Sequence, residues 1–202
     1  MLRFIMEHKL FFILPIAYGL YHLAFKDTSI FWYMYTFALL ILMSAAIVFG
    51  EIKDELRTWQ SLIYGISSAF GIYALLFAGY HFLQFFGASA AASTSDFLSI
   101  FAPNSVWHLL LLMFIVAPGE ELFWRGFVQQ KLKEYLPVSI AIPTAAILFG
   151  FTLGLAGFWQ GIIAGTVVGL ILGYLYEKKK SMPLLIIAHL ALMILIFIIF
   201  PF

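Results

Sequence analysis

The stretch FIVAPGEELFWRGFVQQKLK, from Phe114 to Lys133, holds two adjacent glutamates and an arginine within a run that otherwise suits hydrocarbon. It overlaps an apolar window, Val106–Phe127, that is long enough to cross a bilayer, which takes about 20 residues. Glu120 precedes the end of this window by seven residues, or roughly 10 Å of helix, so the charges are expected at membrane depth. An ionised side chain at the bilayer centre costs at least about 2.5 kcal/mol, so each charge needs a partner or a function.

The composition of the whole chain is that of an integral membrane protein. Of its 202 residues, 64% are hydrophobic and 10% are charged, whereas soluble domains carry about 25% charged residues. The formal net charge is +1 and no basic face is present, so nucleic acid is excluded as a partner. The chain has no cysteine, which excludes disulfides and thiolate-bound zinc.

Outward from the charged stretch, further apolar windows predict an all-α membrane protein, built as a single polytopic bundle of about seven transmembrane helices. The connectors are short, so no second domain is expected, and ASAAASTSD at 88–96 is interpreted as one of these connectors. The windows are Lys9–Phe25, Ile30–Gly50, Leu62–Gly87, Val106–Phe127, Val138–Gly157, Gly161–Tyr176 and Leu184–Phe202.

The basic residues of the connectors predict the orientation, because cytoplasmic loops of membrane proteins carry the excess of Lys and Arg. With the loop sides alternating along the chain, nine basic residues fall on one side and only Lys26 on the other. The N-terminus is therefore expected to be cytoplasmic. The nine are Arg3, Lys9, Lys53, Arg57, Lys131, Lys133, Lys178, Lys179 and Lys180.

Within the charged stretch, the spacing separates a pair from a single residue. Glu121 and Arg125 stand at i and i+4, so they can neutralise each other on one helix face as a structural ion pair. Glu120 points about 100° away, behind Pro118 and Gly119, where the missing backbone donor of proline should loosen the helix. A carboxylate at this position is expected to bind water, and its unpaired burial requires a function.

His189 is the other polar group expected at depth, six residues after Pro183 in the last window. A lone histidine on an apolar helix is either an interhelical hydrogen-bond donor or part of a site. Its depth, similar to that of Glu120, favours a cavity shared by the two residues.

Glycines at every fourth position of the sixth window fall on one helix face and predict a seam of close helix packing. Two glycines of the fifth window are expected to do the same. The residues are Gly161, Gly165, Gly169 and Gly173, with Gly150 and Gly154 in the fifth window.

These motifs resemble the CAAX protease and bacteriocin-processing family of intramembrane endopeptidases. The resemblance rests on EELFWRG at 120–126 and GLILGYLYEKKKSMPLLIIAH at 169–189, and it covers Val106 to Ile194. It implies N-terminal transmembrane helices over 1–105 and protease-like core helices over 106–202, within one integrated membrane domain. It also implies a bacterial plasma membrane, with membrane lipids and a membrane-bound or lipidated peptide or protein as partners.

The resemblance implies roles for four residues. Glu120 is the general base that activates water, and His189 is the histidine that stabilises the oxyanion. Glu121 and Arg125 form the supporting pair.

Two positions depart from the family pattern. Leu153 stands where the F-x-x-x-H motif that opens at Phe149 has its histidine, and Met193 replaces the Asn or Asp expected four residues after His189. General acid–base help is worth about 10²–10⁴-fold and an oxyanion donor about 10²–10³-fold. The chain is therefore either a working endopeptidase or a catalytically silent member that acts as a membrane scaffold or partner-binding protein. A transporter would show two similar halves, and no internal repeat is seen.

No cofactor and no metal ion is expected. Zinc sites use three or four ligands, and the intramembrane candidates are Glu120, Glu121 and His189. Because Glu121 is expected to pair with Arg125, this ligand set does not support a metal, although a name used for the family includes "metalloprotease".

Overall fold

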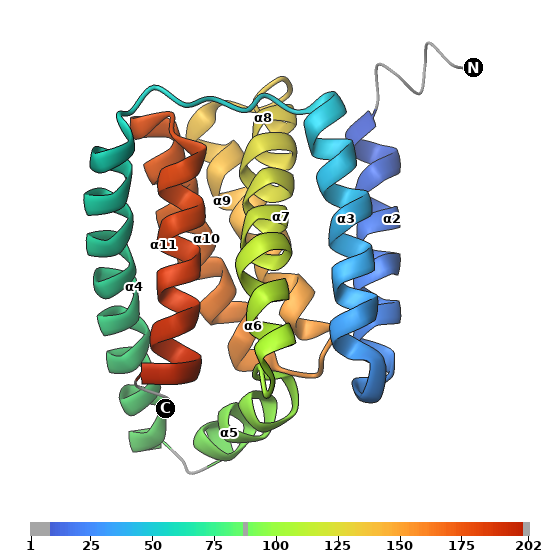
Figure 1. The fold of residues 1–202 in the computed structure, drawn as a ribbon, viewed down its shortest axis with the longest axis vertical. Helices are drawn as coiled ribbons and strands as arrows, with labels where there is room; N and C mark the ends of the chain where they lie inside the picture. Colours follow the sequence, from blue (N-terminus) through green and yellow to red (C-terminus); the bar gives the residue numbers. More distant parts are fainter. Residues whose placement is uncertain (1–8, 87–88, 200–202) are drawn as a thin grey trace.

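The computed structural model describes residues 9–86 and 89–199, and within these ranges it contains helices and no β-strand. The chain is an all-α membrane protein, folded as a bundle whose helices lie side by side along the long axis (Figure 1). Arg3, Gly87 and Phe202, which the sequence predictions include, lie outside the described residues. The helices are α2 (Lys9–Lys26), the 3₁₀ turn η1 (Thr28–Ile30), α3 (Phe31–Phe49), α4 (Thr58–Phe86), α5 (Ser89–Phe101), α6 (Val106–Leu111), η2 (Leu112–Val116), α7 (Ala117–Glu121), η3 (Leu122–Val128), α8 (Gln129–Leu132), α9 (Val138–Gly154), α10 (Trp159–Lys179), α11 (Met182–Ile194) and η4 (Leu195–Ile199).

Each of the seven predicted windows coincides with a helical segment, but these segments differ in length. Among the described residues, five are long and apolar enough to cross a membrane, while α9 is shorter. The helix α2 has 18 residues and is not one of the five, so the count of seven stays a prediction. The five are Thr28–Phe49, Thr58–Phe85, Val106–Leu132, Trp159–Lys179 and Met182–Ile199.

Three helix pairs surround a central helix. α2 packs on α3, α4 packs on α11, and α9 packs on α10. The central helix runs from α6 through α8, with α3 on one side and α11 on the other (Figure 1). The charged stretch is part of this central helix, so the bundle itself supplies its surroundings.

The predicted glycine seam joins α9 and α10. A Cβ added to Gly165 would lie 3.0 Å from the Cα of Gly150, and one added to Gly169 would lie 2.9 Å from the Cα of Ala146. Such distances leave no room for a side chain, so the small residues allow the two backbones to touch. Gly173 faces the side chain of Gln129 instead.

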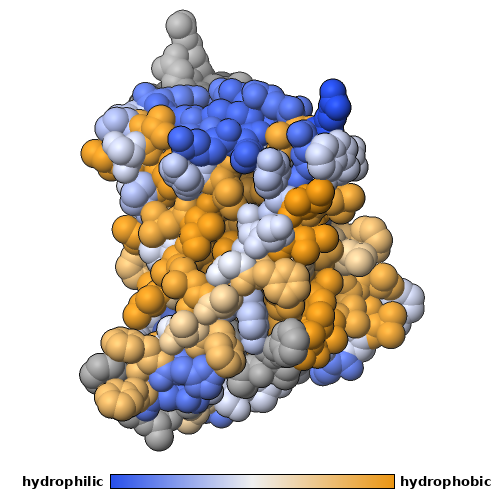
Figure 2. Space-filling view, turned by 90° about the vertical axis from the view of Figure 1, so that its left-hand side faces the viewer, coloured by the Kyte–Doolittle hydropathy of each residue, from blue (hydrophilic) through white to orange (hydrophobic). Residues whose placement is uncertain are grey.

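The two ends of the bundle differ in polarity. Hydrophilic residues form a band over one end, above an apolar belt (Figure 2). Backbone bonds tie the connectors of this end together: Glu55 N–H donates to the carbonyl of Lys180 over 2.9 Å, and Met182 N–H to that of Lys53 over 3.0 Å. We call this end the basic edge. Its basic residues include Lys53, Arg57, Lys131, Lys133, Lys178, Lys179 and Lys180, while the membrane side that it faces stays a prediction.

ASAAASTSD lies between the candidate spans Thr58–Phe85 and Val106–Leu132, as expected of a connector, but most of it is helical and belongs to α5. This helix lies across the end of the bundle opposite the basic edge (Figure 1). The segment is too polar to resemble a membrane span, but the helix is anchored by aromatic residues further along. The ring of Phe97 stacks on that of Phe158, with 4.4 Å between the ring centroids. The ring of Phe101 packs edge-on against that of Phe31, with 4.6 Å between the centroids.

Candidate active site

Glu120 and Glu121 lie on α7, a short α-helical stretch between the π-helical segments η2 and η3. π-Helical turns are rare and frequently occur at functional sites. The irregularity predicted at Pro118 is therefore present as wider turns on both sides of the glutamates, and not as a break. Both carboxylates are buried, with 6% of Glu120 and 0% of Glu121 exposed.

Glu121 is held by two neighbours at the same carboxylate oxygen. Arg125 Nη1 donates to Oε1 over 2.9 Å, in the i, i+4 geometry expected from the sequence. His189 Nδ1, on α11, lies 2.6 Å from the same oxygen. All three side chains are buried, so solvent screens their charges little.

Glu120 does not belong to this ion pair. Tyr35 of α3 donates a hydrogen bond from its hydroxyl to Glu120 Oε1, and His189 Nε2 lies 3.4 Å from Glu120 Oε2. His189 therefore stands between the two carboxylates, with one ring nitrogen towards each. The structure thus brings together all four residues that the sequence singled out on the central helix and on α11.

Tyr35 is the contact that the sequence did not reveal. It lies 85 positions before Glu120, in the aromatic run FWYMYTF at 31–37, where no spacing distinguishes one ring from the next. Its ring lies 5.6 Å from that of Tyr21, whose hydroxyl accepts a hydrogen bond from Trp124 Nε1 over 3.3 Å. The N-terminal helices α2 and α3 therefore take part in building the site.

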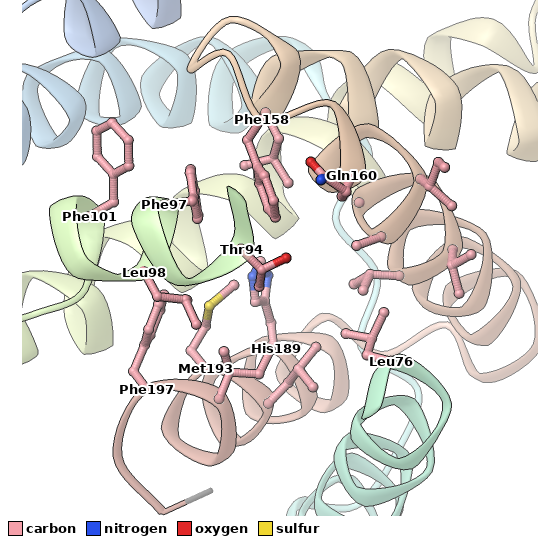
Figure 3. Close-up of a pocket in the computed structure, with 18 of the residues that line it drawn as sticks. Leu76, Thr94, Phe97, Leu98, Phe101, Phe158, Gln160, His189, Met193 and Phe197 are labelled. Atoms are coloured by element: carbon pink, nitrogen blue, oxygen red, sulfur yellow. The ribbon is translucent and has the colours of Figure 1, made fainter. Parts of the chain in front are cut away.

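Glu120, Tyr35 and His189 reach the wall of one cavity of about 380 Å³. Apolar side chains make up most of the remaining wall. Figure 3 shows His189 and Met193 of α11 facing this space, with Phe158 on the opposite wall. The carboxylate and the imidazole are thus placed at the edge of a largely apolar compartment.

Leu153 and Met193, the two positions that depart from the family pattern, line this same cavity. Neither side chain can donate a hydrogen bond. Phe149 packs between the other members of the site: its ring lies 4.6 Å from the Arg125 guanidinium and 6.5 Å, edge-on, from the His189 ring. The pattern positions therefore surround the site, but Leu153 and Met193 lack the polar groups that the family pattern has there.

Among the described residues, no group of three or more His, Asp or Glu side chains is arranged to hold a metal ion. Glu121 Oε1 is engaged by Arg125 and by His189 Nδ1. The donor chemistry of these residues therefore suits an ion pair and a positioned histidine more than metal ligation.

We compared the chain with known proteins, with solved structures and with models of protein families. The chain is 24% identical over 161 residues to "Uncharacterized protein YpbD" of Bacillus subtilis (strain 168), covering 75% of this chain and 79% of that protein. No solved structure matches the chain significantly. The family model described as "Type II CAAX prenyl endopeptidase Rce1-like" matches residues 102–195. The resemblance inferred from the sequence is therefore confirmed: over residues 102–195, this chain matches the Rce1-like family of CAAX prenyl endopeptidases.

Proposed function

We propose that this protein is an intramembrane endopeptidase that cleaves membrane-associated or lipidated peptides, with Glu120 as the general base for water. The family match supports an endopeptidase of CAAX-protease type. The observation that carries the finer proposal is the position of His189, whose Nε2 lies 3.4 Å from Glu120 Oε2 at the wall of the apolar cavity.

In the proposed reaction, Glu120 takes a proton from water while the water oxygen bonds to the carbonyl carbon of the scissile peptide. His189 lies between two carboxylates, and in this reaction its imidazole ring carries both protons. Its Nδ1–H then donates to Glu121, and its Nε2–H is free to stabilise the oxyanion. The proton on Glu120 passes to the leaving nitrogen as the C–N bond breaks, and the carboxylate is restored.

A second function is favoured by two apolar residues of the cavity wall. Leu153 and Met193 line the cavity without a donor, which suits a catalytically silent protein that binds a membrane partner in the same space. The two functions differ in one consequence: only the endopeptidase depends on the charge of Glu120.

The test is peptide cleavage by the full chain in lipid vesicles, read by mass spectrometry with a library of lipidated peptides. Glu120→Gln should abolish cleavage, and Glu134→Gln, at a half-exposed site on the basic edge, should not. Cleavage that survives Glu120→Gln would exclude the proposed base. If the natural chain cleaves nothing and the double variant Leu153→His with Met193→Asn does, the silent function is supported.

The remaining assignments belong to the same proposal. Residues 1–105 would form N-terminal transmembrane helices and 106–202 the protease-like core, in one membrane domain. The bacterial relative supports a bacterial plasma membrane, and the collected Lys and Arg residues of the basic edge support a cytoplasmic N-terminus. Membrane lipids and a membrane-bound peptide or protein would be the partners.

A further inference from the structure

Tyr35 presents a polar group inside an aromatic cluster. The residue is 7% exposed. The centroid of its ring lies 5.0 Å from that of Phe31, 5.6 Å from that of Tyr21 and 5.7 Å from that of Phe25. Its hydroxyl points out of this aromatic cluster and donates a hydrogen bond to Glu120 Oε1. The packing fixes the direction of the hydroxyl, so the donor is held in place before any substrate arrives.

Glu120 has few other partners. In the part of the chain that the structure describes, Arg125 donates to Glu121 and not to Glu120. His189 Nε2 lies 3.4 Å from Glu120 Oε2, but no well-formed hydrogen bond engages this nitrogen. The bond from Tyr35 is therefore what defines the orientation of the Glu120 carboxylate.

Tyr35 also faces the cavity that Leu153 lines. Because leucine offers no hydrogen-bond donor at that wall, a donor to Glu120 must come from elsewhere, and α3 supplies it. We propose that Tyr35 is a positioning residue for hydrolysis, whose hydroxyl holds Glu120 Oε1 so that Oε2 faces His189 and the cavity. This inference rests on the proposed function and adds a residue that lies outside the matched range 102–195.

The first experiment compares Tyr35→Phe with Tyr18→Phe in the full chain. Both variants lose one hydroxyl from the N-terminal helices, and among the described residues that of Tyr18 donates only to the backbone carbonyl of Leu148, over 2.6 Å. Tyr35→Phe should lower kcat by about 10²-fold with KM unchanged, because misplacing a reacting group costs that much. Tyr18→Phe should leave both constants unchanged. A Tyr35→Phe variant with the kcat of Tyr18→Phe, or with a change in KM alone, overturns the proposal.

A second measurement does not depend on cleavage. Dicyclohexylcarbodiimide enters membranes and adds to protonated carboxyl groups, and mass spectrometry gives its rate of addition at Glu120. A carboxyl that loses a hydrogen-bond donor is protonated more of the time, so Tyr35→Phe should label at least threefold faster than the natural chain or Tyr18→Phe. Incorporation of 3-fluorotyrosine at position 35 keeps the ring packed and makes the hydroxyl a stronger donor, so it should slow labelling even if Tyr35→Phe does not fold.

Cleavage and labelling together distinguish a failure of the proposed function from a failure of the positioning role of Tyr35. If Glu120→Gln leaves cleavage intact but labelling at Glu120 follows the hydroxyl of Tyr35, the proposed function fails and the positioning contact stands. If Glu120→Gln abolishes cleavage but the changes at Tyr35 alter neither kcat nor labelling, the contact has no positioning role.

Discussion

His189 Nδ1 and Glu121 Oε1 lie 2.6 Å apart, although the two residues are 68 positions apart in the chain. Glu121 is the ion-pair partner of Arg125, and a carboxylate in an ion pair can only accept a hydrogen bond. The proton of this contact therefore belongs to Nδ1, which turns Nε2 towards Glu120. The ion pair on the central helix thus also orients the histidine of α11.

The first prediction concerns the stability of this ion pair. Glu121→Gln removes the charge and leaves Arg125 buried without its counter-ion, which should lower the free energy of unfolding by about 3–5 kcal/mol. Glu134→Gln removes one partner of the exposed pair with Lys131 and should change it by less than about 1 kcal/mol. Equilibrium unfolding in mixed micelles measures both. Equal effects of the two changes would show that the buried pair does not stabilise the bundle.

The sequence predicts the parts of this site that depend on local spacing and depth. The pair Glu121–Arg125 follows from one helical turn, and His189 follows from its depth in the last window. Tyr35 could not be predicted, because its contact with Glu120 joins helices 85 positions apart and nothing local marks one tyrosine among many aromatic residues. The helix α5 was missed for a different reason: apolar windows detect spans, and α5 lies across the end of the bundle.

The second prediction tests the seam between α9 and α10. Gly169→Ala places a Cβ 2.9 Å from the Cα of Ala146, so the backbones must separate, at a cost of about 1–3 kcal/mol. Gly71→Ala on α4 has no neighbour within 4 Å, and the better helix propensity of alanine should stabilise it by up to about 1 kcal/mol. Thermal unfolding of the two variants should therefore shift in opposite directions. A Gly169→Ala variant as stable as the natural chain would contradict the close approach of the two helices.

The third prediction tests the orientation. Because the chain has no cysteine, a single introduced cysteine is the only thiol of this protein that a maleimide can label. Glu55→Cys lies at the basic edge and Ser95→Cys on α5, and both positions are exposed. A membrane-impermeant maleimide should label Ser95→Cys in intact cells and Glu55→Cys only after permeabilisation, because basic loops stay in the cytoplasm. The reverse pattern would invert the predicted orientation, and labelling of both in intact cells would show that the two ends do not face opposite sides.

The last prediction concerns what the cavity binds, and it holds for an enzyme and for a silent binding protein alike. Ala164 lines the cavity on α10, so Ala164→Trp should fill part of its volume of about 380 Å³ without touching the basic edge. Phe151→Trp introduces the same indole ring on α9, where the natural side chain is 49% exposed and outside the cavity wall. The dissociation constant of a dansylated lipopeptide, read from its fluorescence in vesicles that hold the protein, should rise at least tenfold in Ala164→Trp, or about 1.4 kcal/mol. Phe151→Trp should bind as the natural chain does. If both variants bind the lipopeptide equally well, the cavity is not where the apolar chain of the ligand lies.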